Sequence, residues 1–225
     1  MKQIYMSVSL ILLSAVIISC GSTLPTHFYR IATDPDMNKV DQVIPLKVEV
    51  NSVRAPDRYR DRIVYRRGEY EYGFYEYSRW IAAPGEMIRR SLIDALIEAG
   101  IFSTVDPFGN NSDSDLDLDS EIISFDQVLE GEVNFADFGL ILEFSRSDTG
   151  APVWSYRAKE RIEQQGEESF AAAMSEAVKK VITRAIVEIE KSEKLRGLPG
   201  MLKKGEARMS REKEGRVGMR TDYFG

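Results

Sequence analysis

The sequence predicts a single compact α/β domain, with a mixed β-sheet and two main helices packed on it. Two observations carry this prediction: two runs have apolar residues at helical spacing, and several runs alternate apolar and polar residues as strands do. With 225 residues, 43% of them hydrophobic, the chain is long enough to bury the core of such a domain. We expect the domain to occupy residues 41–193.

The first half of the domain contains four predicted strands. Leu46, Val48 and Val50 alternate with polar residues, which is the period-2 pattern of a half-buried strand. Two more strands are expected at residues 63–66 and 69–77, joined near Gly68. A short strand is expected at residues 101–105.

The second half is again predicted as β structure. Leu116 and Leu118 alternate with acids, which favours a strand with an acidic outer face. Residues 138–145 and 153–162 flank Ser147-Asp148-Thr149-Gly150, a strong turn signal, so they are expected to pair as a hairpin.

Two helices are predicted. Pro84 suits the first position of the earlier one, and Gly100 suits the position after its end. The later one is expected at residues 167–191, with acidic residues at its start and Lys191 near its end, as the helix dipole prefers. Its apolar stripe could form a coiled-coil seam, but packing onto the sheet is the preferred interpretation.

Residues 1–19 are predicted to be a signal peptide. Lys2 precedes a mostly apolar run that is shorter than the roughly 20 residues needed to span a bilayer. The run ends in Ile17-Ile18-Ser19-Cys20, which resembles a bacterial lipobox. We therefore expect the Cys20 thiol to carry a diacylglyceryl group after cleavage. An ordinary signal peptide or an uncleaved anchor is the alternative.

Residues 20–40 are then expected to be a lipidated amino terminus and a tether. Several acyl chains on Cys20 would anchor the chain stably, because each buried methylene adds about 0.8 kcal/mol. By resemblance to lipoprotein sorting in Gram-negative bacteria, Gly21 in place of an aspartate favours the outer membrane, with the domain facing the periplasm.

The composition argues against several function classes. One cysteine excludes an intramolecular disulfide, and one histidine, His27, leaves almost no room for a Ser-His or Cys-His nucleophile. The formal net charge of −6 argues against a general nucleic-acid binder. We expect a non-enzyme with no catalytic residue, no metal site and no cofactor beyond the lipid on Cys20.

Charge is unevenly distributed along the chain. Oxygen ligands recur in residues 110–121, but an EF-hand loop counted from Asp113 would put Leu118 at its glycine position, so specific calcium binding is disfavoured. Six arginines gather between Arg54 and Arg67, interleaved with Tyr59 and Tyr65. They could form a solvated, ion-paired face, or a surface for a partner protein or lipid phosphates. Residues 194–225, with nine basic and four acidic residues, are expected to be a flexible basic tail.

The segment from Ala55 to Leu96 carries a family resemblance. Its pattern is a proline, a Tyr-x-x-Arg-Ile-Val run, a Tyr-x-Arg-Trp and a helix opened near a proline. In this pattern the chain resembles the ABC-type transport auxiliary lipoproteins, the PqiC-like family. The matching residues are Pro56, Tyr59, Arg62, Ile63, Val64, Tyr77, Arg79, Trp80 and Pro84.

The resemblance implies an outer-membrane lipoprotein that works with an inner-membrane ABC transporter and an MCE-type periplasmic protein, in systems that move lipid between the two membranes. It also implies a compact α/β fold. Partner binding is expected at Arg58, Tyr59, Arg62, Arg79 and Trp80. Alternatively, Trp80 is a core anchor and Arg79 its ion-paired support.

Two other functions stay open from the sequence. One is a structural envelope lipoprotein that assists assembly of an outer-membrane protein or a polysaccharide exporter. The other is direct lipid carriage in an apolar groove.

Overall fold

The computed structural model describes residues 24–33, 39–107, 113–165 and 170–202. The predicted signal peptide, Cys20 and residues 203–225 of the predicted tail lie outside these ranges. No helix among the described residues is both long enough and apolar enough to cross a membrane.

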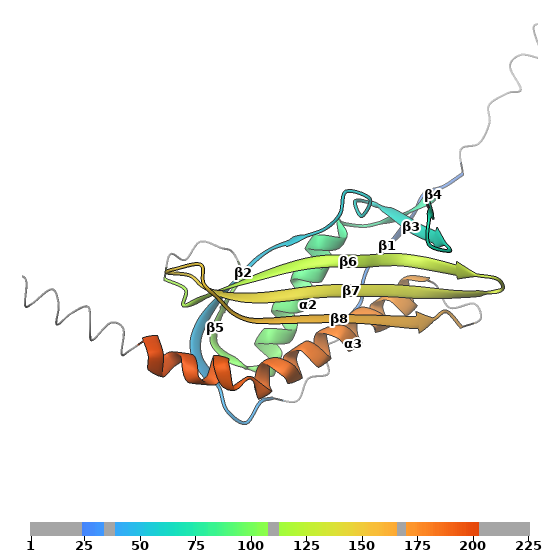
Figure 1. The fold of residues 1–225 in the computed structure, drawn as a ribbon. Coiled ribbons are helices and arrows are strands. Elements are labelled where there is room, and N and C mark those ends of the chain that lie inside the picture. The colour runs from blue at the N-terminus through green and yellow to red at the C-terminus, as the bar shows by residue number, and fades with distance from the viewer. Residues whose placement is uncertain (1–23, 34–38, 108–112, 166–169, 203–225) are drawn as a thin grey trace, which may run out of the picture.

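The described chain forms one mixed α/β unit, as predicted (Figure 1). In chain order its elements are β1 (His27–Tyr29), β2 (Ile44–Arg54), β3 (Arg62–Arg67), β4 (Glu71–Trp80), α2 (Pro84–Ala99), β5 (Phe102–Asp106), β6 (Leu116–Glu130), β7 (Val133–Arg146), β8 (Pro152–Glu163) and α3 (Phe170–Lys191).

Strand β6 organises the sheet, which contains the eight strands of the described residues. Along one edge, the first half of β6 pairs in parallel with β2, and its last residues pair in parallel with β3. Along the other edge β6 is antiparallel to β7, which in turn pairs with β8. The sheet continues from β2 to β5, and from β3 through β4 to β1. Strand β6 therefore links three parts of the sheet: the pair β2 and β5, the group β3, β4 and β1, and the hairpin of β7 and β8.

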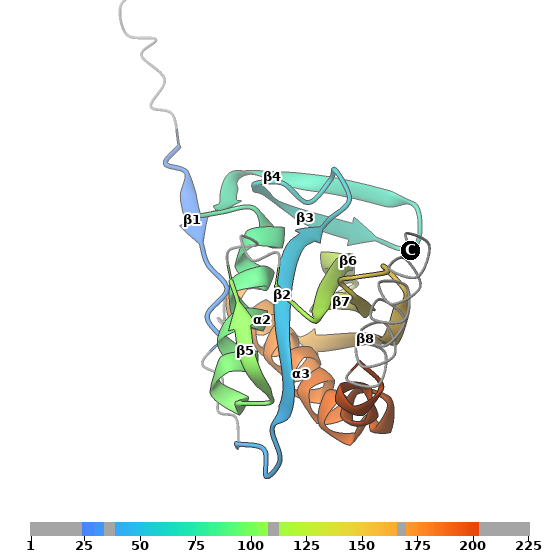
Figure 2. The ribbon, with the colours of Figure 1, turned by 90° about the vertical axis from the view of Figure 1, so that its left-hand side faces the viewer.

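Both helices cover the same face of this sheet (Figures 1 and 2). Helix α2 packs against β2 and β5, and α3 packs against β7 and β8. The predicted apolar stripe of α3 is buried from Phe170 to Ile189. Packing on the sheet, rather than a coiled-coil seam, is thus the role of this stripe.

The ends of α2 follow the sequence signals. Pro84 begins the helix at a position where its missing N–H costs nothing. Gly100 takes the left-handed conformation, with φ of 63°, and its N–H donates to the carbonyl of Ile97. Side chains with a Cβ adopt this φ at a cost, which is why glycine suits this stop.

A bulge in β6 changes which residues face the core. The register with β7 shifts between Ile122 and Ser124, so the buried apolar positions pass from Ile122 to Phe125. Gly139 lies opposite the bulge. A Cβ there would come within 2.6 Å of Ile123 Cγ1, so only glycine lets the two strands approach.

Two predicted boundaries need correction. Residues 27–29, predicted as part of a tether, form strand β1 on the edge of the sheet. Residues 194–202, predicted as the start of a flexible tail, belong to a helical stretch that follows α3. The reason is burial: Leu195 and Leu198 are 0% and 5% exposed and belong to the hydrophobic core.

Candidate docking site

The segment between β2 and β3, residues 55–61, is fixed to the sheet by Tyr59. The side chain of Tyr59 is only 3% exposed, and its ring meets the ring of Phe125 edge-on at 6.3 Å between centroids. Its hydroxyl donates to Asp126 Oδ1 on β6 at 2.8 Å. Burial raises the pKa of Tyr59 well above its ordinary value, and the neighbouring Asp126 raises it further. The phenol therefore keeps its proton and remains a donor.

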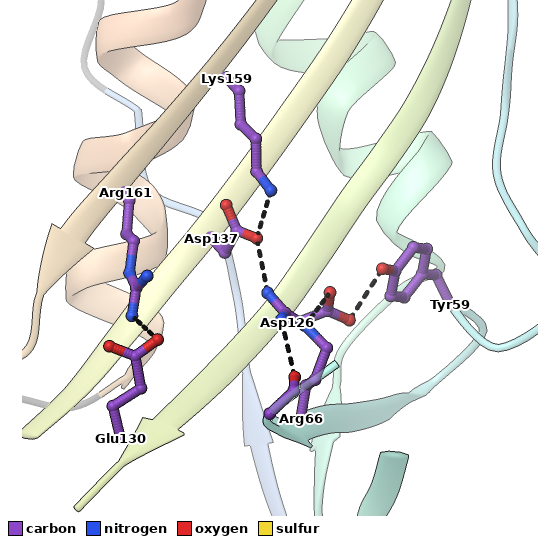
Figure 3. A network of polar contacts seen from close by, with 8 residues as sticks. Tyr59, Arg66, Asp126, Glu130, Asp137, Lys159 and Arg161 are labelled. Carbon is purple, nitrogen blue, oxygen red and sulfur yellow. Dashed lines mark hydrogen bonds and ion pairs between the residues drawn. The ribbon is translucent and has the colours of Figure 1, made fainter. Parts of the chain in front are cut away.

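Beneath Tyr59 lies a buried charge network (Figure 3). The β6–β7 register places Asp126 directly opposite Asp137, and two buried like charges in this position would repel each other. Arg66 on β3 reaches both: its Nε lies 3.8 Å from Asp126 Oδ2 and its Nη2 3.2 Å from Asp137 Oδ2. Lys159 on β8 adds a 2.8 Å contact to the same oxygen of Asp137. The network therefore ties four strands together.

Burial and the neighbouring donor and cationic groups act in opposite directions on the pKa of Asp126. Burial is the largest influence and raises the pKa of Asp126, because it disfavours the charged carboxylate. The hydrogen bond from Tyr59 and the charges of Arg58 and Arg66 oppose this rise without cancelling it. Asp137 Oδ1 has no hydrogen-bond partner among the described residues.

Arginines and aromatic rings meet on the outside of this segment. The Arg58 guanidinium lies 4.4 Å from the centroid of the Tyr59 ring and 5.4 Å from that of Tyr72. The Arg62 guanidinium lies 5.7 Å from the centroid of the Phe74 ring. We call Arg58, Arg60, Arg62, Tyr72 and Phe74 the arginine–aromatic surface. It borders an open depression of about 370 Å³.

Asp61 joins this surface to the end of β4. Its backbone carbonyl accepts a hydrogen bond from the Trp80 backbone N–H, and its carboxylate pairs with the Arg79 guanidinium. Two successive residues of β4 therefore hold the last residue before β3. This arrangement fixes Arg79 at the margin of the arginine–aromatic surface.

The five residues expected to bind a partner do not share one environment. Arg58, Arg62 and Arg79 keep accessible surface, whereas Trp80 is 2% exposed. The Trp80 ring lies 5.1 Å from that of Phe125 and 5.9 Å from that of Phe170, between the sheet and α3. Tyr59 and Trp80 are core residues that support the surface, because their rings are already covered by the chain itself. Of the five residues expected to bind a partner, the three arginines are thus the ones whose side chains are accessible.

The acidic stretch behaves as a strand with an acidic outer face, as predicted. Leu116 and Leu118 are buried, while Asp117 accepts from Ser147 Oγ at 2.7 Å and Asp119 from Asn51 Nδ2 at 3.1 Å. Among the described residues, no group of three or more His, Cys, Asp or Glu side chains could hold a metal ion.

The buried half of this site was not predicted from the sequence. Asp126, Asp137 and Lys159 were not singled out, although two of them carry a visible signal. Each aspartate has apolar neighbours in its strand, Asp126 after Phe125 and Asp137 between Ala136 and Phe138, and acids are rarely buried without a partner. An acid in such a run indicates a partner on a neighbouring strand.

A known protein family matches the part of the chain that carries this fold and surface. The model of the family described as "ABC-type transport auxiliary lipoprotein component" matches residues 29–186, which include the arginine–aromatic surface, the buried network and most of α3. The chain belongs to this family. The predicted resemblance is confirmed.

Two solved structures share this fold with a TM-score above 0.5. The chain is similar to protein XCC0632 from Xanthomonas campestris, with 19% identity and a TM-score of 0.64, over 72% of this chain and 93% of that one. It is also similar to an uncharacterized protein, with 14% identity and a TM-score of 0.55, over 74% and 99%. Lipoprotein GNA1162 from Neisseria meningitidis matches at 13% identity and a TM-score of 0.39, over 66% and 100%. No curated protein matches the chain.

Family membership makes the chain an auxiliary lipoprotein component of ABC-type transport. It associates the chain with a transporter and with a membrane-anchored place in the cell envelope. The family is not a known enzyme family.

Proposed function

We propose that this lipoprotein is a non-catalytic docking subunit, held in the outer membrane by the lipid on Cys20 and facing the periplasm. It positions an MCE-type periplasmic protein and an inner-membrane ABC transporter that move lipid between the two membranes. Family membership supports the transport role. The observation that carries the docking role is the arginine–aromatic surface.

This surface has the chemistry of a protein-binding site. Arginine, tyrosine and phenylalanine are enriched in protein interfaces, and arginine and tyrosine dominate their strongest contacts. A guanidinium stacked on a ring still offers its N–H edge to a carboxylate. Tyr59 and Asp126 hold the segment in place before any partner arrives, which lowers the entropy lost on binding.

Lipid carriage in the depression beside Tyr75 and Phe170 is disfavoured by the size of that depression. The depression between Tyr75 and Phe170 has a volume of about 190 Å³. Pockets for drug-sized ligands start at roughly 300 Å³. A phospholipid would need a larger space than this depression offers.

The docking role is tested by crosslinking and affinity capture of the full lipoprotein from envelopes. The wild type is expected to recover an MCE-type protein or an ABC subunit. Arg62→Glu should lose that recovery because it reverses the charge at the depression, whereas the matched control Arg157→Glu, an exposed arginine on β8, should retain it. Recovery of an outer-membrane protein or a polysaccharide exporter instead would favour an assembly role.

The anchor is tested separately. Cys20→Ser removes the thiol that would receive the lipid, so this variant should leave the membrane fraction and appear in the soluble periplasmic fraction. A Cys20→Ser protein that still fractionates with membranes would contradict the lipid anchor.

A further inference from the structure

Strand β1 and the end of β4 share an outward-facing surface of unusual composition. The parallel register pairs Phe28 with Arg79, and the Ile81 N–H donates to the carbonyl of Tyr29. Phe28 on β1 and Arg30 just after it are two positions apart, and both are exposed. Arg79 on β4 and Ile81 just after it have the same two-residue spacing beside them. We call Phe28, Arg30 and Ile81 the β1 surface.

The two apolar members of the β1 surface are open to solvent. Phe28 is 63% exposed and Ile81 is 67% exposed, and Arg30 is exposed beside them. Arg30 and Ile81 also line one common depression with the start of α2. Single exposed apolar residues are ordinary, but here two large ones lie next to an arginine on one edge of the sheet.

The distance to the proposed lipid anchor is short. Six residues separate Cys20 from His27, the first residue of β1. A chain extends by at most about 3.5 Å per residue, so Cys20 lies within about 25 Å of β1 in any conformation. A bilayer that holds the acyl chains is therefore always near the β1 surface. Figure 2 shows β1 and the end of β4 side by side at the end of the domain where the described chain begins.

We propose that the β1 surface rests on the phospholipid headgroup layer of the membrane that holds Cys20. Its chemistry fits this partner: apolar and aromatic side chains enter the interfacial layer, and arginine binds lipid phosphates. The proposal deepens the proposed function, since it rests on the lipid at Cys20. It gives the domain a fixed orientation, with the start of α2 near the membrane and the end of α2 away from it.

The test uses the full mature lipoprotein reconstituted in vesicles of phosphatidylethanolamine and phosphatidylglycerol, with no other protein present. Cys20 is the chain's one cysteine, and its thiol is blocked by the lipid, so an added cysteine alone takes a fluorescent label. Labels are placed with Phe28→Cys, Ile81→Cys and the control Ile97→Cys. Ile97 is 55% exposed and lies about 20 Å along α2 from Pro84, so the control matches Ile81 in residue type and exposure.

The labels at residues 28 and 81 should emit at shorter wavelength on vesicles and should be quenched by nitroxide carried on the lipid acyl chains. The label at residue 97 should show neither effect. Protein that floats with the vesicles but shows equal quenching at residues 81 and 97 would overturn the orientation and leave the anchor standing. Protein that does not float would overturn the anchor, and the orientation with it.

Discussion

The hydroxyl of Tyr59 donates to Asp126 Oδ1 across 2.8 Å, and this bond joins the segment before β3 to the middle strand of the sheet. Both side chains are buried, so neither group can exchange the bond for water. The partly buried Arg58 and the exposed Arg62 are therefore positioned by a contact that no partner would touch.

Removal of this hydroxyl should destabilise the domain. Tyr59→Phe keeps the ring but leaves a buried carboxylate oxygen without its donor, which costs about 1–3 kcal/mol. The free energy of unfolding in urea measures the loss. Tyr70→Phe is the control, because Tyr70 is 90% exposed and its hydroxyl should contribute little. Equal stability of both variants would mean that the bond does not hold the segment.

The carboxyl of Asp126 should make stability depend on pH in a defined direction. Its pKa in the folded protein lies above the ordinary value of 3.8, so between these two values the folded chain retains a proton that the unfolded chain has released. The contribution of this group to stability is thus fully present below 3.8 and falls as the pH rises through the window.

Asp126→Asn isolates this effect, because the amide has no proton to lose there. The free energy of unfolding of the wild type, minus that of the variant, should decrease as the pH is raised from below 3.8 to neutral. Denaturant titrations over this range measure the difference. A difference that grows with pH would show that Arg66 and Tyr59 outweigh burial.

Substitutions of Arg79 and Trp80 should lower the free energy of unfolding by different amounts, although the two residues are neighbours in the sequence. Trp80→Ala empties a site between Phe125 and Phe170 and should cost about 3–5 kcal/mol of stability. Arg79→Ala breaks a partly exposed ion pair with Asp61 and should cost at most about 1 kcal/mol. Unfolding curves read out both. A stable Trp80→Ala protein that fails to capture its partner would indicate that Trp80 contacts the partner directly.

The helical residues after α3 should contribute to the core. Leu195→Ala should lower the free energy of unfolding by about 2–5 kcal/mol, because the side chain is fully buried. Met201→Ala in the same stretch should change it by less than about 0.5 kcal/mol, because Met201 is 65% exposed. If both substitutions had the same small effect, residues 193–202 would not be packed on the domain.

Periodic sequence signals predicted most of the fold. The α2 boundaries, the β7–β8 hairpin at Gly150 and the apolar stripe of α3 follow from local spacing and turn chemistry, so they are readable without a structure. The β1 strand was missed because three residues carry no usable alternation. The helical stretch after α3 was missed because its glycines and Pro199 hide two buried leucines.

The candidate site was only half predictable. The density of arginines and tyrosines from Arg54 to Arg67 was visible in the sequence, and the structure places Arg58 and Arg62 around one depression. Burial of Tyr59 and Trp80 depends on contacts with Asp126, Phe125 and Phe170, which are 45 or more residues away along the chain. Local patterns carry no information about such contacts, so the supporting residues could not be distinguished from the exposed ones.

The double pairing of β6 has a consequence for the order in which the domain can assemble. Strand β2 lies between β5 and β6, and β3 pairs with both β4 and β6, so neither group of strands is joined to the other until β6 arrives. A chain that is delivered amino terminus first presents β1 to β5 before the strand that unites them. During synthesis the central edges of the first half therefore stay unpaired until β6 forms, and the late strands β6 to β8 close the domain.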